Sequence, residues 1–338
     1  MEDFSLLTPR NPNSTERIQL RRRLGRLQTM DTSIAKATSN MARLAAEKPK
    51  LANVLIRRRF VRRTERAPGD HSDRSLPPRP LRPPSTRIMS PRGAALRFYL
   101  TALFEAQVSE ARADTRPVNN RSLRGTHDDT GWADLLASPA RNASGNVYMN
   151  VAAKKRRQIH EALGRLHREE LVALPNINAG SNKYEGFRLM DEGGAREQGP
   201  NELYRLPKAK DKDAFELPIT FFTQGWVHCF EDTELAFVLM MASLGATTKE
   251  VTIEGAIRLL CYGLGRDAYE AHVMLNRLGL LEVRPAPNRY ADGKIQNYGG
   301  PSDAHLHSFK LLPEGFETPA YHAVLAAIDK ALDQDGDN

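Results

Sequence analysis

Cysteine is scarce in this 338-residue chain, which holds only Cys229 and Cys261. Two cysteines are too few for a disulfide framework, so the composition favours the reducing cytoplasm. Long apolar runs are absent too, since no stretch approaches the roughly 20 residues that a membrane-spanning helix needs. The acidic first residues lack the basic and then apolar order of a signal peptide. We therefore expect a cytoplasmic protein that is neither secreted nor inserted in a membrane.

Motifs for catalysis are also missing. The two cysteines, His228 and His272 lack the paired spacing of zinc ligands, such as C-x₂-C. The sequence contains no G-x-x-x-x-G-K-[ST] phosphate loop and no G-x-S-x-G nucleophile elbow. These absences predict that the protein is not an enzyme and uses no cofactor, metal ion or small-molecule substrate.

Positive charge is unevenly distributed along the chain, whose overall net charge is +8. Residues 1–89 hold 20 Lys and Arg against 8 Asp and Glu, and residues 90–214 hold 20 against 16. Residues 215–338 hold 9 against 17, so this last third is acidic. In residues 1–214 arginine outnumbers lysine by 31 to 9, which favours phosphate binding. A polyanion is therefore expected to contact the first two thirds of the chain.

A long helix is predicted over residues 15–47. Asn13 and Glu16 have the spacing of a capping box, and Pro49 marks the end. One apolar series repeats every seven residues, and a second lies three residues further on: Leu20, Leu27, Ile34 and Met41, then Met30, Ala37 and Leu44. This pattern predicts either a coiled coil that joins two copies or an amphipathic helix that packs on its own protein.

A basic segment follows, in which a second helix is predicted from Leu51 to Val61. The helix leads into a run of five arginines around one aromatic residue: Arg57, Arg58, Arg59, Arg62 and Arg63. Such a run predicts an arm that binds phosphates without sequence preference, although solvated tails carry similar runs. We assign residues 1–66 to this basic N-terminal region.

Proline then becomes frequent, with seven prolines between Ala67 and Pro91. Residues 67–89 are therefore predicted to form an extended linker that lets the N-terminal region move relative to the rest. Ser90 and Pro91 have the order of an N-cap and a first helical residue, so a helix is expected to begin there.

Residues 90–190 are predicted to form the first folded module. A helix to about residue 111 is followed by a short helix over 131–137 and a longer one over about 146–169. Two short strands, 171–174 and 184–190, then enclose a loop rich in Asn, Gly and Ser. This order of helix, short helix, long basic helix and hairpin resembles the winged helix-turn-helix family. The resemblance implies a DNA-binding module.

The predicted helix at 146–169 carries the expected DNA-reading face. Four apolar residues fall within roughly 40° on the helix and form a stripe that anchors it to a core: Ala152, Ile159, Leu163 and Leu166. The opposite side is polar and basic: Asn150, Lys154, Arg157, Glu161, Arg165 and Arg168. The major groove admits one helix, on which Arg or Lys can bond guanine and Asn can bond adenine.

These patterns predict a double-stranded DNA-binding protein, either a replication initiator or a transcription regulator. We expect base edges or adjacent phosphates to be contacted by Asn150, Lys154 and Arg157, with Arg165 on the same side. The DNA backbone is expected to be contacted by Lys155, Arg156 and the hairpin residue Lys183. The arginine run 57–63 would add sequence-independent affinity.

Residues 191–214 are predicted to be a second linker, and residues 215–338 repeat the architecture. Helices are expected at 233–244, 253–262 and 267–278, strands at 280–284 and 308–312, and a last helix at 320–332. Because this module is acidic, its third helix is expected to serve dimer or partner contacts. Any DNA contact here would come from Arg284, Arg289 and Lys294.

The predicted fold class is therefore mainly α with small β-hairpin wings, in two winged-helix domains. This arrangement is similar to theta-type plasmid replication initiators and to tandem winged-helix transcription regulators. The resemblance implies a nucleoid-associated homodimer that binds repeated or two-half-site DNA.

Two other functions stay open. His305-Leu306-His307 has the form found in rolling-circle nickases, where two strand histidines hold a metal ion and a tyrosine attacks DNA. Tyr321 would be that tyrosine, although its separation from the histidines is short and no third ligand is evident. Alternatively, the winged helices bind protein and the chain is a scaffold or regulator.

Overall fold

The computed structural model describes residues 11–67, 75–90, 94–110, 112–126, 129–138, 151–180, 182–195, 200–208, 210–286 and 306–333. Within these ranges the chain is mainly helical with small antiparallel sheets, as the sequence predicted. The helices are α1 (Ser14–Ala46), α2 (Pro84–Ile88), α3 (Ala95–Ser109), α4 (Val151–Arg168), α5 (Thr220–Thr223), α6 (Trp226–Cys229), α7 (Asp232–Ser243), α8 (Gly255–Leu260), α9 (Arg266–Arg277) and α10 (Ala320–Asp333). The strands are β1 (Asn53–Arg57), β2 (Val172–Ala173), β3 (Arg188–Leu189), β4 (Ala214–Pro218), β5 (Val251–Thr252), β6 (Leu281–Arg284) and β7 (Ser308–Leu311).

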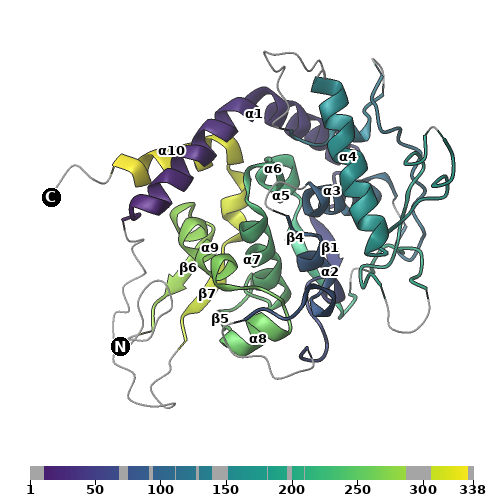
Figure 1. Ribbon diagram of the computed structural model, residues 1–338. Coiled ribbons are helices and arrows are strands. Elements are labelled where there is room, and N and C mark those ends of the chain that lie inside the picture. The colour runs from purple at the N-terminus through teal and green to yellow at the C-terminus, as the bar shows by residue number, and fades with distance from the viewer. Residues whose placement is uncertain are drawn as a thin grey trace.

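Helix α1 begins with the predicted capping box, in which Asn13 and Glu16 each accept a hydrogen bond from the other's backbone N–H. The predicted apolar series is buried almost throughout: Leu27, Met30, Ile34, Ala37, Met41 and Leu44. It packs against α10, α5 and α3, and Figure 1 shows α1 running along one side of the molecule from α10 towards α3 and α4. Of the two predicted alternatives, the structure therefore shows the amphipathic helix that packs on its own protein.

Strand β1 lies where the sequence predicted a helix over 51–61, and that prediction is wrong. Asn53–Arg57 pairs antiparallel with β4, so that Val54 faces Leu217 and Ile56 faces Phe215 across the ladder. Val54 and Ile56 are fully buried, and β-branched residues favour a strand when a partner strand is available. The partner strand, Ala214–Pro218, is distant in the sequence, so a local pattern cannot show it.

The described part of the predicted linker is packed rather than extended. A 3₁₀ helix covers Arg79–Leu81, and all five residues of α2 are buried. The Nε atom of Arg87 in α2 lies 2.9 Å from the Oε2 atom of Glu169, directly after α4. Proline is compatible with the first turn of a helix, so the proline-rich composition did not exclude this local structure.

The elements from α3 to β3 follow the predicted order. Helix α4 packs on α3, a 3₁₀ helix covers Trp132–Asp134, and β2 pairs antiparallel with β3. Helix α3 begins at Ala95 rather than at Ser90, whose backbone N–H donates to the carboxylate of Asp232.

The elements from α7 to β7 form a second helical group with a three-stranded antiparallel sheet of order β5-β7-β6. Strand β5 was not predicted, and Thr252, which was expected to cap a helix, lies in it. Helix α8 instead begins after Glu254.

One hydrophobic core connects the regions that the sequence divided into separate domains. Phe104 of α3 stacks on Phe222 of α5 with ring centroids 5.0 Å apart, and β1 and β4 lie between the two helical groups. The predicted regions 1–66, 90–190 and 215–338 therefore meet in a common interior, which fixes how their surfaces are presented.

Candidate nucleic-acid interface

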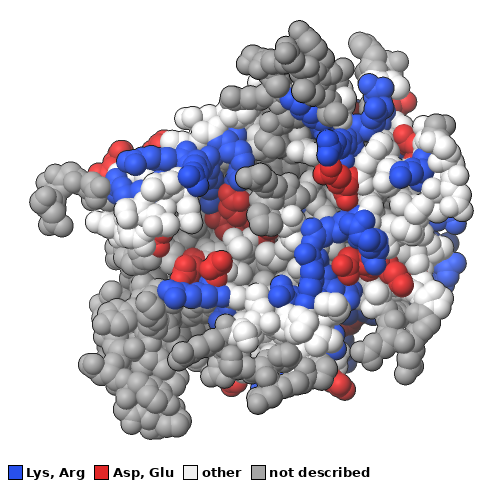
Figure 2. Space-filling view, in the orientation of Figure 1, with Lys and Arg blue, Asp and Glu red and all other residues white. Residues whose placement is uncertain are grey.

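Helix α4 has one apolar and one basic side. Its buried residues are Ile159, Ala162, Leu163 and Leu166, which are packed against α3 and the core. Ala152, which was predicted to lie in this stripe, is exposed instead. The exposed charged residues of the helix are Arg156, Arg157, Glu161 and Arg168. Figure 2 shows Lys and Arg side chains gathered over α4.

The other residues predicted to read DNA from this helix lie differently. Asn150 is outside the described residues. Lys154 is half-buried, and Arg165 is turned towards α2, where its Nη2 donates to the carbonyl oxygen of Arg87 at 3.0 Å. Arg165 is therefore occupied by a contact within the protein.

Lys155 is half-buried on the side of α4 that faces Asp134. The pKa of Lys155 is lowered to about 8 by burial, an effect that Asp134 opposes and Lys36 reinforces. Lys36 itself pairs with Asp134 at 2.8 Å. Two lysines therefore share one carboxylate here, and Lys155 is less available for DNA phosphates than the sequence predicted.

The β2–β3 hairpin is held against the exposed side of α4 by aromatic contacts. The rings of His160 and Tyr184 are stacked with centroids 4.4 Å apart. The Nζ atom of Lys183 lies 4.8 Å from the centre of the Tyr184 ring, a cation–π distance. Burial lowers the pKa of His160, and the charges of Arg156 and Lys183 add to that effect. The hairpin thus adds its own cation to those of the helix.

Two shallow grooves flank the His160–Tyr184 pair, with volumes of about 490 and 410 Å³. Their cationic lining comes from three elements: Arg156, Arg157 and Arg168 of α4, Lys183 of the hairpin, and Arg124 of the loop before the 3₁₀ helix. We call these five residues the α4 cation cluster. Sequence reasoning missed Arg124, because a single arginine in a polar loop forms no pattern, and it placed Tyr184 in a strand without assigning it to this surface.

Two acidic residues line these grooves, Glu161 and Glu185, and Glu185 accepts the backbone N–H of Leu123 at 3.0 Å. Glu161 accepts from Arg157 one helical turn earlier at 2.9 Å, and both side chains are more than half exposed (69% for Arg157 and 64% for Glu161). Exposed pairs of this kind contribute only about 0.3–0.5 kcal/mol. A phosphate can therefore displace Glu161 from Arg157 at little cost.

The corresponding helix of the second group, α9, has a different environment. Its residues Asp267, Glu270 and Arg277 line a groove of about 510 Å³ whose other wall is the first part of α1. Arg266 pairs with Glu270 at 2.8 Å, again one turn apart. Arg284 pairs with Glu250 at 2.9 Å, whereas Arg289 and Lys294 are outside the described residues. The charges on α9 are thus mixed, and α1 lies beside it.

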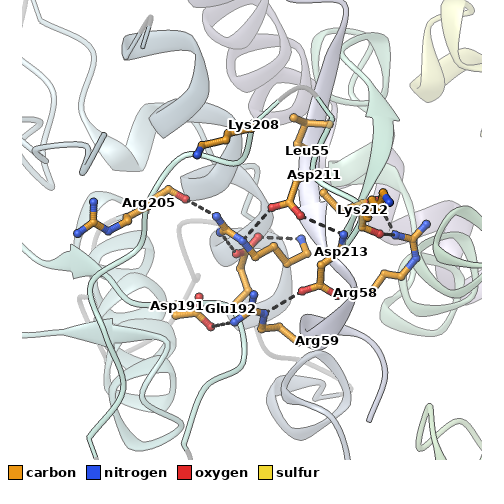
Figure 3. A network of polar contacts seen from close by, with 12 residues as sticks. Leu55, Arg58, Arg59, Asp191, Glu192, Arg205, Lys208, Asp211, Lys212 and Asp213 are labelled. Carbon is orange, nitrogen blue, oxygen red and sulfur yellow. Dashed lines mark hydrogen bonds and ion pairs between the residues drawn. The ribbon is translucent and has the colours of Figure 1, made fainter. Parts of the chain in front are cut away.

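The arginine run 57–63 is largely engaged inside the protein (Figure 3). The Nη1 atom of Arg57 lies 2.6 Å from the Oε2 atom of Glu192, and its backbone N–H donates to the same carboxylate. Arg58 donates to the backbone carbonyl oxygens of Lys212, Ala214 and Ser243. Arg59 pairs with Asp191 and Asp213.

The last two arginines of the run are only partly free. Arg62 is exposed, with its guanidinium 5.8 Å from the centre of the Tyr262 ring. Arg63 is half-buried and donates its backbone N–H to Cys261. The run is therefore part of the fold and not a separate arm.

The residues expected for a nickase are not arranged as that chemistry needs. His307 is buried, its Nδ1 accepts from the backbone N–H of Ala286 at 2.9 Å, and its ring lies among His272 and Phe309. His305 is outside the described residues, and Tyr321 is half-buried on α10. Within the ranges that the structure describes, no group of three His, Cys, Asp or Glu side chains is close enough to hold a metal ion.

None of the described helices combines the length and the apolar content needed to cross a bilayer. Comparisons of the chain with protein-family models, curated proteins and solved structures found no match to any of them.

Proposed function

We propose that this protein binds double-stranded DNA as a replication initiator or transcription regulator, with the exposed side of α4 as its main contact. The α4 cation cluster carries the proposal. It brings five positive side chains from a helix, a hairpin and a loop to one surface, against two acidic residues in the same lining, Glu161 and Glu185. Several positive side chains on one surface attract a polyanion such as the phosphate backbone of a duplex.

The order of elements supports a winged-helix reading of both helical groups. In the second group, three helices are interrupted by β5 and followed by β6 and β7, and β7 lies between the other two strands. In the first group, α3, the 3₁₀ helix, α4 and the β2–β3 hairpin follow the same order. A winged helix places its third helix in the major groove and its hairpin along the backbone.

The dimensions of α4 suit that placement. Its 18 residues extend about 27 Å at 1.5 Å per residue, and its apolar side is fixed to α3. Arg156 and Arg157 lie on the first half, from which they can enter a groove. Lys183 and Arg124 lie beside the helix and would contact phosphates.

The second group is proposed to serve protein contacts, including those of a homodimer, and not DNA reading. Its helix α9 carries Asp267 and Glu270 on the surface next to α1. Acidic side chains there repel phosphates, so this surface suits a protein partner.

The test compares two matched arginines on equivalent helices. Arg157 and Arg266 each pair with a glutamate four residues later on an exposed surface, at 2.9 and 2.8 Å. We expect the double variant Arg156→Ala/Arg157→Ala to weaken binding to a labelled duplex and to lower the slope of log K against log salt by about two. Fluorescence anisotropy over a salt series measures both. Arg266→Ala should leave affinity and slope unchanged.

Selection of bound fragments from random DNA then separates base reading from phosphate binding. If Arg157 contacts a base, its loss costs about 1–3 kcal/mol on the selected site and less on other sequences. Wild-type affinity in the double variant would refute α4 as the contact surface. Failure of the wild-type protein to bind any duplex at low salt would favour the protein-binding scaffold instead.

A further inference from the structure

A cavity separate from the two grooves of the α4 cation cluster lies where α1, α3, α4 and α7 meet. Its volume is about 710 Å³, large enough for a small organic molecule. Its lining shares no residue with the two grooves of the α4 cation cluster, although Gln158 of α4 contributes to it. The cavity is therefore distinct from the proposed DNA contact.

His228 is the unusual residue in this lining. It is only 3% exposed, and neither Nδ1 nor Nε2 has a hydrogen-bond partner. Burial lowers its pKa to about 3, with Arg97 as a further cause, so the imidazole is neutral. A neutral imidazole offers one N–H donor and one nitrogen acceptor. Buried polar groups are nearly always paired in folded proteins, so two unpaired nitrogens beside a cavity point to a missing partner.

The charges around the cavity are balanced. Arg97 pairs with Asp232 at 3.2 Å, and Arg26 pairs with Glu231. The Oδ2 atom of Asp232 accepts the backbone N–H of Ser90, and its Oδ1 is the atom that pairs with Arg97. The site therefore offers a donor and an acceptor without a net charge, which favours an uncharged ligand over an anion.

Besides Ser90, Gln158 and Thr233, the remaining lining is apolar and includes two thioethers. Met30 of α1 and Met89 before α3 line the cavity together with Leu136. Methionine sulfur makes favourable contacts with aromatic rings, and its flexible side chain adapts to a flat surface. An aromatic ring with polar edges fits these walls better than a flexible polar chain does.

We propose that this cavity binds an uncharged aromatic heterocycle of the nucleobase or nucleoside class. The two ring nitrogens of His228 form its hydrogen bonds, and Met30 and Met89 contact the ring. This inference goes beyond DNA binding and does not depend on it.

The test is isothermal titration of the full-length protein, without DNA, with adenosine, guanosine, cytidine, uridine and the corresponding free bases. We expect saturable binding of at least one of them. His228→Leu should weaken that binding by about tenfold or more, because it removes the hydrogen bonds at similar volume. His322→Leu, at an exposed position on α10, is the matched control and should bind as the wild type does.

A second readout separates ligand binding from a structural role of His228. Because His228→Leu removes two buried nitrogens that lack partners, it should raise the Tm of the ligand-free protein. A lower Tm would show that His228 has a structural partner and would overturn the proposal. So would the absence of binding by every nucleoside and base, or equal binding by His228→Leu and the wild type.

Discussion

Two groups of arginines in this chain have similar local sequence and opposite surroundings. In the run 57–63, Arg57 is buried and pairs with Glu192, and Arg58 is half-buried and donates to backbone carbonyl oxygens (Figure 3). On α4, Arg156 and Arg157 are exposed, and Arg157 has Glu161 as its ion-pair partner. Arginine thus stabilises the interior in the run 57–63 and provides exposed positive charge on α4.

The difference arises from carboxylates that are distant in sequence. Arg57 and Glu192 are separated by 135 positions, whereas Glu161 lies within the same helix as Arg157. A run of arginines in the sequence therefore shows only how many cations are present. The acidic and carbonyl groups that the fold places beside them determine how many can still bind phosphates. Substitutions in the run 57–63 should therefore lower stability more than DNA binding. Substitutions on α4 should lower DNA binding more than stability.

The largest expected effect is that of Arg57→Met on stability. Glu192 is completely buried and Arg57 is the cation paired with it, so the variant leaves a carboxylate in the interior without its cation. Removing one partner of a buried ion pair costs about 3–5 kcal/mol. Urea unfolding at pH 8, where Glu192 is ionised, measures the free energy of unfolding.

Arg156→Met is the matched control for this measurement. Because Arg156 is exposed, its replacement should change the free energy of unfolding by no more than about 0.5 kcal/mol. Equal losses in the two variants would show that burial does not separate the two arginine groups. The double variant Arg57→Met/Glu192→Leu should recover much of the loss, because no buried charge then remains.

Helix positions could be predicted from the sequence wherever one element carries its own pattern. The stripe of α1 and the two sides of α4 follow from periodicity alone, and the capping box of Asn13 follows from spacing. Strand β1 could not be predicted, because Asn53–Arg57 is short and becomes a strand by pairing with β4. The packed residues of α2 were missed for a related reason, since their burial depends on Glu169 and other distant groups.

The candidate site shows the same limit. Arg156, Arg157 and Arg168 were placed on the outer or flanking side of α4 by helical geometry, and they are exposed. Arg165 and Lys155 were placed there too, but α2 and Asp134 draw them away from that surface. A helical wheel shows the direction of a side chain and not its neighbours from other elements. For that reason it did not reveal the contribution of Arg124 or the Tyr184 stack.

A smaller effect concerns the pH dependence of stability. Burial raises the pKa of Glu192 from its ordinary value of 4.5 to about 7, although Arg57 opposes the shift. The folded protein therefore holds this proton more tightly than the unfolded chain does. The stabilisation is fully present below pH 4.5 and is lost as the pH rises through 7, with a slope of at most about 1.4 kcal/mol per pH unit.

Glu192→Gln isolates this group, because glutamine does not titrate. Chemical unfolding of both proteins between pH 5 and pH 8 should show that the wild type loses stability relative to the variant as the pH rises. Parallel curves would mean that Glu192 is ionised throughout this range. In that case the buried network would be held by a full ion pair, and the contrast with the exposed pair on α4 would be sharper still.

The smallest effect is expected at Arg59, whose exposure lies between that of the buried Arg57 and that of the exposed Arg157. Its side chain is 43% exposed, and its partners Asp191 and Asp213 lie at 3.3 and 3.0 Å. Water screens such pairs, so Arg59→Ala should lower the free energy of unfolding by about 1 kcal/mol or less, and by less in high salt. The DNA affinity of the Arg59→Ala variant should equal that of the wild type, because two carboxylates already neutralise the charge of Arg59. A loss of DNA affinity as large as that of Arg157→Ala would mean that these carboxylates release Arg59 to phosphates. The arginine run would then belong to the DNA contact as well as to the fold.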